Sequence, residues 1–176
     1  MEKHLFINPF EQKMKLDPLE KKYTKPDGTE VIEKKELTGK IVYEKCPDGA
    51  LLFRSFNNAG VLVLDFARDR NFEIGHRYDT TGKMVYKYDS VYDENNVLAQ
   101  KNEYDFDYYD DGKKKLEVVS TFPTGTITYL QYDNNGKRIE KIVERGTVKT
   151  WFDENDKPIK RETDRGSGGI ITEDLS

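Results

Sequence analysis

From about residue 23 onward, the chain alternates between short runs of strand-forming residues and short clusters of turn-forming residues. The runs are rich in Val, Ile, Tyr, Phe and Thr, as in segments 39–44, 50–56 and 113–121. The clusters between them contain Gly, Asn, Asp and Pro, which accept the backbone angles of tight turns. This pattern predicts about twelve strands, and strands joined by tight turns are antiparallel. We therefore expect an all-β protein, a long twisted antiparallel meander that is open or partly curled.

One short phrase recurs along this pattern. It consists of an aromatic residue, usually followed by Asp, then Gly, Asn or Asp four positions after the aromatic residue, and then an apolar run. The clearest copies span residues 78–85 and 132–139, and looser copies begin at Phe56, Tyr92, Tyr108 and Phe152. Successive copies are 22, 14, 16, 24 and 20 residues apart. This uneven spacing predicts a meander of unequal β-hairpins rather than a strict solenoid.

The pattern divides the chain into an N-terminal segment (1–22), an antiparallel β-repeat domain (23–165) and a flexible C-terminal tail (166–176). Asp17 and Pro18 are typical of a helix start, which predicts one or two helical turns there. Residues 61–64 are apolar at every position. Such a strand is expected to be covered on both faces, and the N-terminal segment is expected to cover part of one face.

The composition allows only a thin core, because 35% of the residues are apolar and 35% are charged. Tyrosine supplies much of the aromatic surface and suits a sheet that is wet on one side. The single cysteine, Cys46, cannot form a disulfide within the chain, which fits a reducing compartment. The first ten residues lack the apolar core of a secretory signal, and no run is long enough to span a membrane. We therefore expect a cytoplasmic protein that does not bind membranes.

Few residues favour catalysis. His4 and His76 have no partners at a metal-binding spacing, and Cys46 precedes a turn with no His nearby in the sequence. We therefore predict a protein that is not an enzyme and binds no metal or cofactor. Two alternatives stay open: a catalytic carboxylate pair that sequence alone does not reveal, and a calcium site among the aspartates of residues 105–111, whose spacing does not match an EF-hand loop.

The charge is distributed unevenly along the chain. The formal net charge is −4, but residues 89–111 contain eight acids and one base, Lys101, so this segment carries −7 and the remainder +3. A surface of one sign steers a partner of the opposite sign, and tyrosine is enriched in interface hot spots. These features predict an acidic, tyrosine-rich docking surface for a basic protein. The alternative is an ordinary solvated strand face.

The candidate contact residues of this surface are Asp93, Glu103, Tyr104, Asp105, Asp107, Tyr108, Asp110 and Asp111. Within residues 103–108 the acids and aromatics alternate, so they are expected to point to opposite faces of the sheet. Direct binding of nucleic acid is not expected, because the densest aromatic residues lie among acids rather than in a basic groove.

The phrase Tyr-Asp-x-x-Gly-Lys/Arg-x-apolar of residues 78–85 and 132–139 resembles the YD repeat of RHS-type proteins, and the short β-hairpin repeats of bacterial antitoxin-like proteins. The resemblance covers residues 43–163. Large secreted members of the family form shells around toxins, whereas small cytosolic chains with such repeats occur beside toxin genes as immunity proteins. A chain of 176 residues is too short to form a shell, so the resemblance implies the second role.

We therefore expect a non-catalytic immunity protein that binds and neutralises a cognate toxin of a contact-dependent or polymorphic toxin system. Such toxins are often nucleases, whose active clefts are basic because they hold phosphates. An acidic, tyrosine-rich surface would block a cleft of this kind. The alternative, from a different functional class, is an exported or surface structural repeat module that binds carbohydrate or a host protein.

Overall fold

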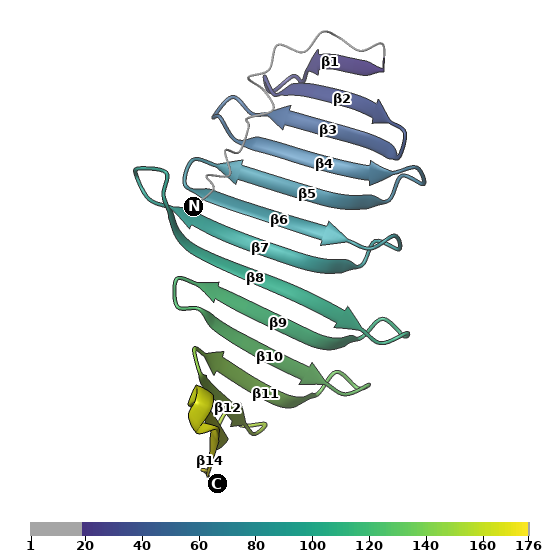
Figure 1. Ribbon diagram of the computed structural model, residues 1–176. Helices are drawn as coiled ribbons and strands as arrows, with labels where there is room; N and C mark the ends of the chain where they lie inside the picture. The colour runs from purple at the N-terminus through teal and green to yellow at the C-terminus, as the bar shows by residue number, and fades with distance from the viewer. Residues whose placement is uncertain (1–18, 176) are drawn as a thin grey trace.

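A computed structural model describes residues 19–175, which form fourteen β-strands in one sheet (Figure 1). The strands are β1 (Glu20–Thr24), β2 (Glu30–Glu36), β3 (Gly39–Lys45), β4 (Leu51–Asn57), β5 (Leu62–Asp69), β6 (Phe72–Tyr78), β7 (Met84–Tyr92), β8 (Leu98–Tyr108), β9 (Lys114–Phe122), β10 (Thr126–Tyr132), β11 (Arg138–Arg145), β12 (Val148–Phe152), β13 (Pro158–Asp164) and β14 (Ile170–Asp174). A single 3-10 turn, η1 (Gly166–Gly168), lies between β13 and β14.

Each strand pairs antiparallel with the strands before and after it in the sequence, so the order of strands in the sheet is the order along the chain (Figure 1). The outer strands, β1 and β14, pair with one neighbour each, so the sheet is open. The prediction of an all-β antiparallel meander is confirmed, with fourteen strands where the pattern indicated about twelve.

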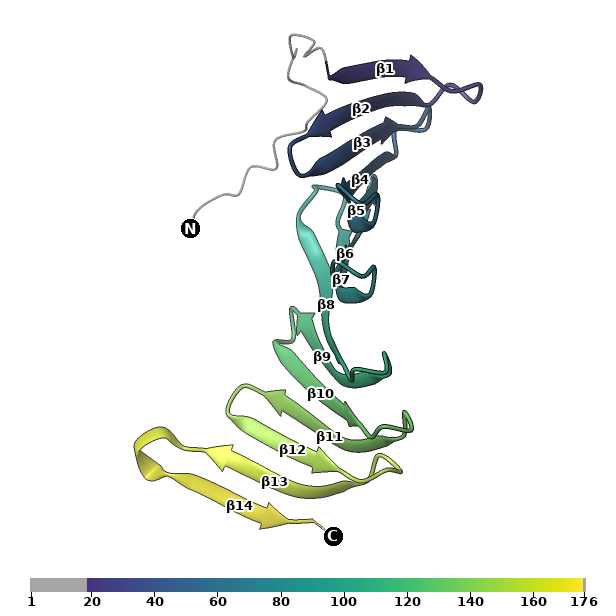
Figure 2. The ribbon, with the colours of Figure 1, turned by 90° about the vertical axis from the view of Figure 1, so that its right-hand side faces the viewer.

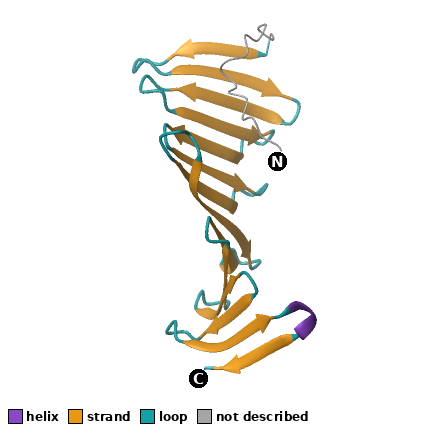
Figure 3. Cartoon of the chain, turned by 60° about the vertical axis from the view of Figure 1, so that its left-hand side comes forward, coloured by secondary structure: helices purple, strands orange, loops and turns teal. Residues whose placement is uncertain are grey.

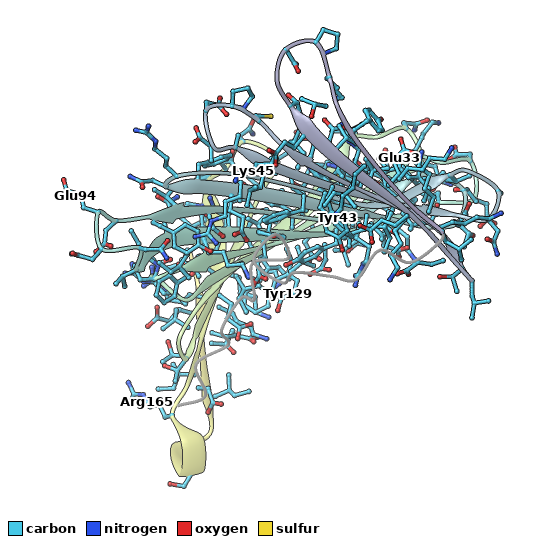
Figure 4. All side chains as sticks on the ribbon, turned by 90° about the horizontal axis from the view of Figure 1, so that it is seen from above. Glu33, Tyr43, Lys45, Glu94, Tyr129 and Arg165 are labelled. Carbon is cyan, nitrogen blue, oxygen red and sulfur yellow. The ribbon has the colours of Figure 1, made fainter. Side chains whose placement is uncertain are left out.

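The described residues form a single layer, so almost no side chain is fully covered. In this part of the chain the buried apolar side chains are Val31, 1% exposed, and Val42, 8% exposed. Most other strand residues are half-buried, because side chains on neighbouring strands cover one another. The layer twists along its length, as the twist of individual strands accumulates. In Figure 2, β5 and β6 are seen nearly end-on, whereas β13 and β14 are seen from the side, and Figure 4 shows the last strands running across the direction of the first ones.

The cross-strand register assigns every regularly paired residue to one of two faces. Face A carries Val42 and its partners Glu33 and Arg54, and face B carries Tyr43 and its partner Phe53. Alternate residues of a strand lie on opposite faces, and strands with their turns at both edges make up the whole layer (Figure 3).

Long basic side chains cover aromatic rings on both faces. On face B the Lys160 ammonium lies 4.5 Å from the centre of the Trp151 ring, and on face A that of Lys141 lies 4.8 Å from the centre of the Phe152 ring. The aliphatic stems of such lysines pack on the rings while their charges stay hydrated. This packing explains how a chain with 35% charged residues stabilises a single layer.

The recurring phrase forms a five-residue loop with a fixed set of hydrogen bonds. After Tyr78, the N–H of Gly82 donates to the carbonyl of Asp79 (3.1 Å), and the N–H of Asp79 donates to the carbonyl of Lys83 (2.8 Å). The Asp79 carboxylate also accepts the N–H groups of Thr81 and Lys83, at 2.8 and 3.0 Å. The same side-chain bonds are made in their own loops by Asn57, Asp93, Asp133 and Asp153.

The residue four positions after the aromatic has a left-handed backbone in each copy of the phrase. Its φ angle is 88° at Gly82, 60° at Asn96 and 62° at Asp156. Gly, Asn and Asp tolerate this conformation better than other residues. The backbone of the loop therefore explains why the phrase has one of these three at that position.

Five of the six copies place their loops on one edge of the sheet, the right-hand edge in Figure 1. These are the copies that begin at Phe56, Tyr78, Tyr108, Tyr132 and Phe152. The copy at Tyr92 joins β7 to β8 at the opposite edge. Without that copy the intervals become 22, 30, 24 and 20 residues, each the length of one hairpin. The uneven spacing in the sequence arises because five copies lie at one edge of the sheet and the copy at Tyr92 lies at the other.

The N-terminal expectations have different outcomes. Asp17 and Pro18 lie outside the described residues, but the helical turns predicted there do not reach Glu20, where strand β1 begins. The segment 1–22 was expected to cover one face of the sheet. Its residues 1–18 also lie outside the described residues, and its last three residues, 20–22, belong to strand β1. The expectation that 61–64 are covered on both faces is wrong, because Leu64 is 40% exposed.

The C-terminal tail predicted from residue 166 contains an ordered strand. Strand β14 pairs with β13 from Ile170, opposite Asp164, to Asp174, opposite Lys160. The run of Gly and Ser before it forms η1 and the turn into β14. A five-residue strand after a glycine-rich segment has too short a pattern to stand out from the sequence.

The carboxylates of these loops make the stability of the fold depend on pH in the acid range. The N–H of Lys137, with that of Asn135, holds the pKa of Asp133 below its usual 3.8, and the hydrogen bond from Thr81 does the same for Asp79. A carboxylate with a lowered pKa stabilises the fold fully above its unfolded pKa, and this stabilisation is lost as pH falls through the folded value. The urea concentration at the midpoint of unfolding should therefore decrease as the pH is lowered below about 4.

The variant D79N/D133N tests this assignment. Asparagine still accepts the N–H groups of the loop, as Asn57 does, but it does not titrate. The urea midpoint of the variant should therefore fall less between pH 5 and pH 3, as about two fewer groups titrate. An equal fall in both proteins would place the acid sensitivity elsewhere.

Candidate binding surface

Strand β8 carries its acidic and aromatic side chains on opposite faces, as its sequence predicts. Glu103, Asp105 and Asp107 lie on face B, and Tyr104 and Tyr108 lie on face A. Asp105 and Asp107 are exposed, whereas both tyrosines are half-buried. Of the eight predicted contact residues, three acids therefore share one surface.

The other three predicted residues lie in loops at the two edges of the sheet. Asp93 is in the β7–β8 loop, where its carboxylate accepts the N–H groups of Asn95 and Val97 at 2.9 and 2.8 Å. Asp110 and Asp111 are in the β8–β9 loop at the opposite edge. Strand β8 has 11 residues, so at ~3.3 Å per residue about 36 Å separates the two loops. The structure does not bring the eight residues together.

Neighbouring bases neutralise part of the acidic charge. Glu103 lies 2.8 Å from the Lys101 ammonium and accepts a hydrogen bond of 2.6 Å from the Tyr86 hydroxyl. These two bonds hold the pKa of Glu103 below its usual value. Asp107 lies 3.3 Å from the Lys115 ammonium, and both side chains are about half exposed. The local charge is therefore weaker than the −7 of the sequence segment.

Asp105 differs from these two acids because its carboxylate has no partner within the described residues. Its side chain is exposed, and within residues 19–175 it makes no ion pair or hydrogen bond. Its cross-strand partners are Tyr86 on β7 and Val118 on β9. The carboxylate therefore stands between an aromatic and an aliphatic side chain. The base nearest along this row is Arg77, which lies over the Tyr86 ring at 5.3 Å and forms no ion pair with Asp105.

The tyrosines beside these acids come from β7 rather than β8. Tyr86 is the cross-strand partner of Asp105, and Tyr88 that of Glu103, so both lie on face B. The Tyr86 hydroxyl donates to Glu103, and the Tyr88 hydroxyl donates to the buried Glu73 at 2.9 Å. Burial raises the pKa of both phenols. Sequence reasoning missed them because only the register of β7 against β8 places them beside the acids.

Tyr104 and Tyr108 belong to the packing of face A. The ammonium groups of Lys87 and Lys83 lie 5.1 and 5.6 Å from the centres of the Tyr104 and Tyr108 rings, respectively. The Tyr108 hydroxyl donates to the carbonyl of Met84 at 2.6 Å. Contacts of this kind hold neighbouring strands together. They place these tyrosines on the face opposite Glu103, Asp105 and Asp107, as the alternation of residues in β8 predicts.

The described residues contain no group of three or more His, Cys, Asp and Glu side chains placed to hold a metal ion. His76 Nδ1 lies 2.6 Å from Asp65 Oδ1, and the two residues are direct cross-strand partners on face A. Cys46 is half-buried in the loop between β3 and β4. The contact between His76 and Asp65 is explained by the packing of β5 against β6.

No protein-family model and no curated protein sequence matches the chain. No helix in residues 19–175 is long and apolar enough to cross a membrane.

Proposed function

We propose that this protein is a non-catalytic immunity protein of the cytoplasm. It binds and neutralises a basic toxin, a nuclease of a contact-dependent or polymorphic toxin system, through face B at β7 and β8. The observation that carries the proposal is the exposed carboxylate of Asp105, which has no partner within residues 19–175 and lies next to Asp107 on an open sheet face. Exposed acids attract a basic protein, and a nuclease cleft is basic because it holds phosphates.

The aromatic part of the proposed surface is supplied by β7. Tyrosine side chains contribute large apolar contact area at interfaces, and the hydroxyl of Tyr86 already holds Glu103 in a fixed position. A contact group that is fixed before binding loses less conformational entropy on binding. The proposed contact residues are Tyr86, Tyr88, Glu103, Asp105 and Asp107.

A pull-down with the tagged chain from its native organism, at low and high salt, tests the proposal. We expect a single basic protein in stoichiometric amount, with less of it retained at high salt because its binding depends on exposed charges. Fractionation of the same cells should place the chain in the cytoplasm.

Two outcomes would contradict the proposal. Retained glycans without a protein partner would support the structural repeat module that binds carbohydrate. A periplasmic or surface location would exclude an immunity protein that acts in the cytoplasm.

A further inference from the structure

Among the described residues, the two outer strands of the sheet, β1 and β14, each have one edge without a neighbouring strand, and the side chains of these two strands differ. All five residues of β14 are exposed, including Ile170 at 66% and Ile171 at 37%. Strand β1 is exposed from Lys21 to Thr24. Free edges are sites where further strands can add, and proteins usually protect them with Pro, bulges or charges. Neither β1 nor β14 contains Pro or a bulge, and their charges differ in sign.

The backbone groups that point outward can be identified from the hydrogen bonds at each end. The N–H of Leu175 donates to the carbonyl of Ile159, so Leu175 faces β13 and, by alternation, Thr172 faces the free edge. The carbonyl of Leu19 accepts from the N–H of Lys35, so Leu19 faces β2 and Lys22 faces the other free edge. Within the part of the chain that the structure describes, the N–H and C=O groups of Thr172 and Lys22 are therefore unpaired, and they lie at opposite ends of the sheet.

The cross-strand register links the two ends through continuous rows. On face A, one row of direct partners runs through all fourteen strands from Lys21 to Glu173, and another runs from Tyr23 to Ile171. On face B, a row runs in the same way from Lys22 to Thr172. If β14 of one copy pairs antiparallel with β1 of another, these rows continue without a shift.

The side chains at this junction are complementary. Glu173 meets Lys21, an ion pair, and Ile171 meets Tyr23, an aliphatic–aromatic pair; both kinds stabilise antiparallel strands. The unfavourable pair in the same register is Asp174 with Glu20, but Glu20 already lies 3.5 Å from the Lys22 ammonium and its side chain is only 4% exposed.

We infer that copies of this chain join end to end, with β14 of one copy adding antiparallel to β1 of the next. Pairing of two β1 strands in the corresponding register is disfavoured, because it places Lys22 opposite Lys22. A junction of β14 with β1 is heterologous, because it joins two different strands. It leaves one β1 and one β14 available at the ends of the assembly, so the assembly grows beyond a dimer. This assembly is independent of the proposed toxin binding, which uses the middle of face B.

Charge reversal at the junction tests the register. The full chain, with no tag at either end, is studied by analytical ultracentrifugation over a range of concentrations at low ionic strength. We expect the mass of the wild type to rise past that of a dimer, and K21E and E173K each to weaken association about tenfold. The charge swap K21E/E173K should restore association, because it recreates the ion pair in the opposite sense.

A proline substitution tests the role of the backbone. Thr172→Pro removes an outward N–H and leaves the hydrogen bonds to β13 in place, and an edge strand tolerates proline. This variant should stay monomeric with an unchanged unfolding midpoint, while the control Thr172→Val should associate like the wild type.

Several results would overturn the inference. A wild type that is monomeric at all concentrations would do so, as would an oligomer that T172P leaves intact. A wild type whose mass does not rise past that of a dimer, and whose association K21E does not weaken, would indicate pairing of two β14 strands instead.

Discussion

Reversal of Asp105 and Asp107 to lysine is expected to slow association with the basic partner about tenfold or more at low ionic strength. Asp105 is exposed and, within the described residues, unpaired, and Asp107 has one exposed partner, Lys115, at 3.3 Å. Exposed pairs of this kind contribute little to folding, so the free energy of unfolding should stay the same. Stopped-flow mixing measures the association rate, and the difference should shrink as salt screens the charges.

The matched control is D69K/E94K, which makes the same change in net charge. Asp69 ends β5 and Glu94 lies in the β7–β8 loop, and both are exposed at the edge opposite the β8–β9 loop; Glu94 projects from the sheet in Figure 4. The association rate of D69K/E94K should stay within about threefold of that of the wild type. Equal slowing in both variants would show that net charge alone acts, and an unchanged rate in D105K/D107K at low salt would exclude face B as the docking surface.

The hairpin architecture was predictable because it is encoded locally. Each copy of the phrase specifies its own loop: Asp79 or Asn57 accepts two N–H groups, and Gly82 supplies the left-handed residue. Loops of this length fix the antiparallel pairing of the strands on either side. Strand β1 lies before the first copy of the phrase and β14 follows the last one, and these were the strands that sequence reasoning placed partly in a helix start or in a tail.

The binding surface was less predictable because it depends on register between strands. The sequence shows that Tyr104 and Asp105 point to opposite faces, which the structure confirms. It does not show which tyrosines lie next to Asp105, because that depends on where the bulge between Val91 and Tyr92 shifts β7 against β8. Charge neutralisation was also hidden, since Lys115 is eight positions from Asp107 in the sequence.

Gly39→Ala is expected to destabilise the sheet by about 3 kcal/mol or more. Gly39 begins β3 with a φ angle of 150°, and a Cβ atom there would lie 1.8 Å from the carbonyl oxygen of Phe56. That oxygen belongs to the backbone of β4, which the ladder ties to β3 through the pairs of Gly39 with Asn57 and of Lys40 with Phe56. Relief of the clash therefore requires the end of the β3–β4 ladder to open. Urea unfolding followed by circular dichroism measures the loss.

Gly49→Ala separates the steric effect from the backbone effect. Gly49 has a φ angle of 92°, but a Cβ atom there would meet nothing within 4 Å. This variant should lose only the cost of a left-handed alanine, about 1 kcal/mol. The difference between the two variants then measures the clash with β4, because both replace a glycine of positive φ. If the two losses are equal, the close approach of Gly39 to Phe56 does not exist in solution, and the register of β3 against β4 differs from that described.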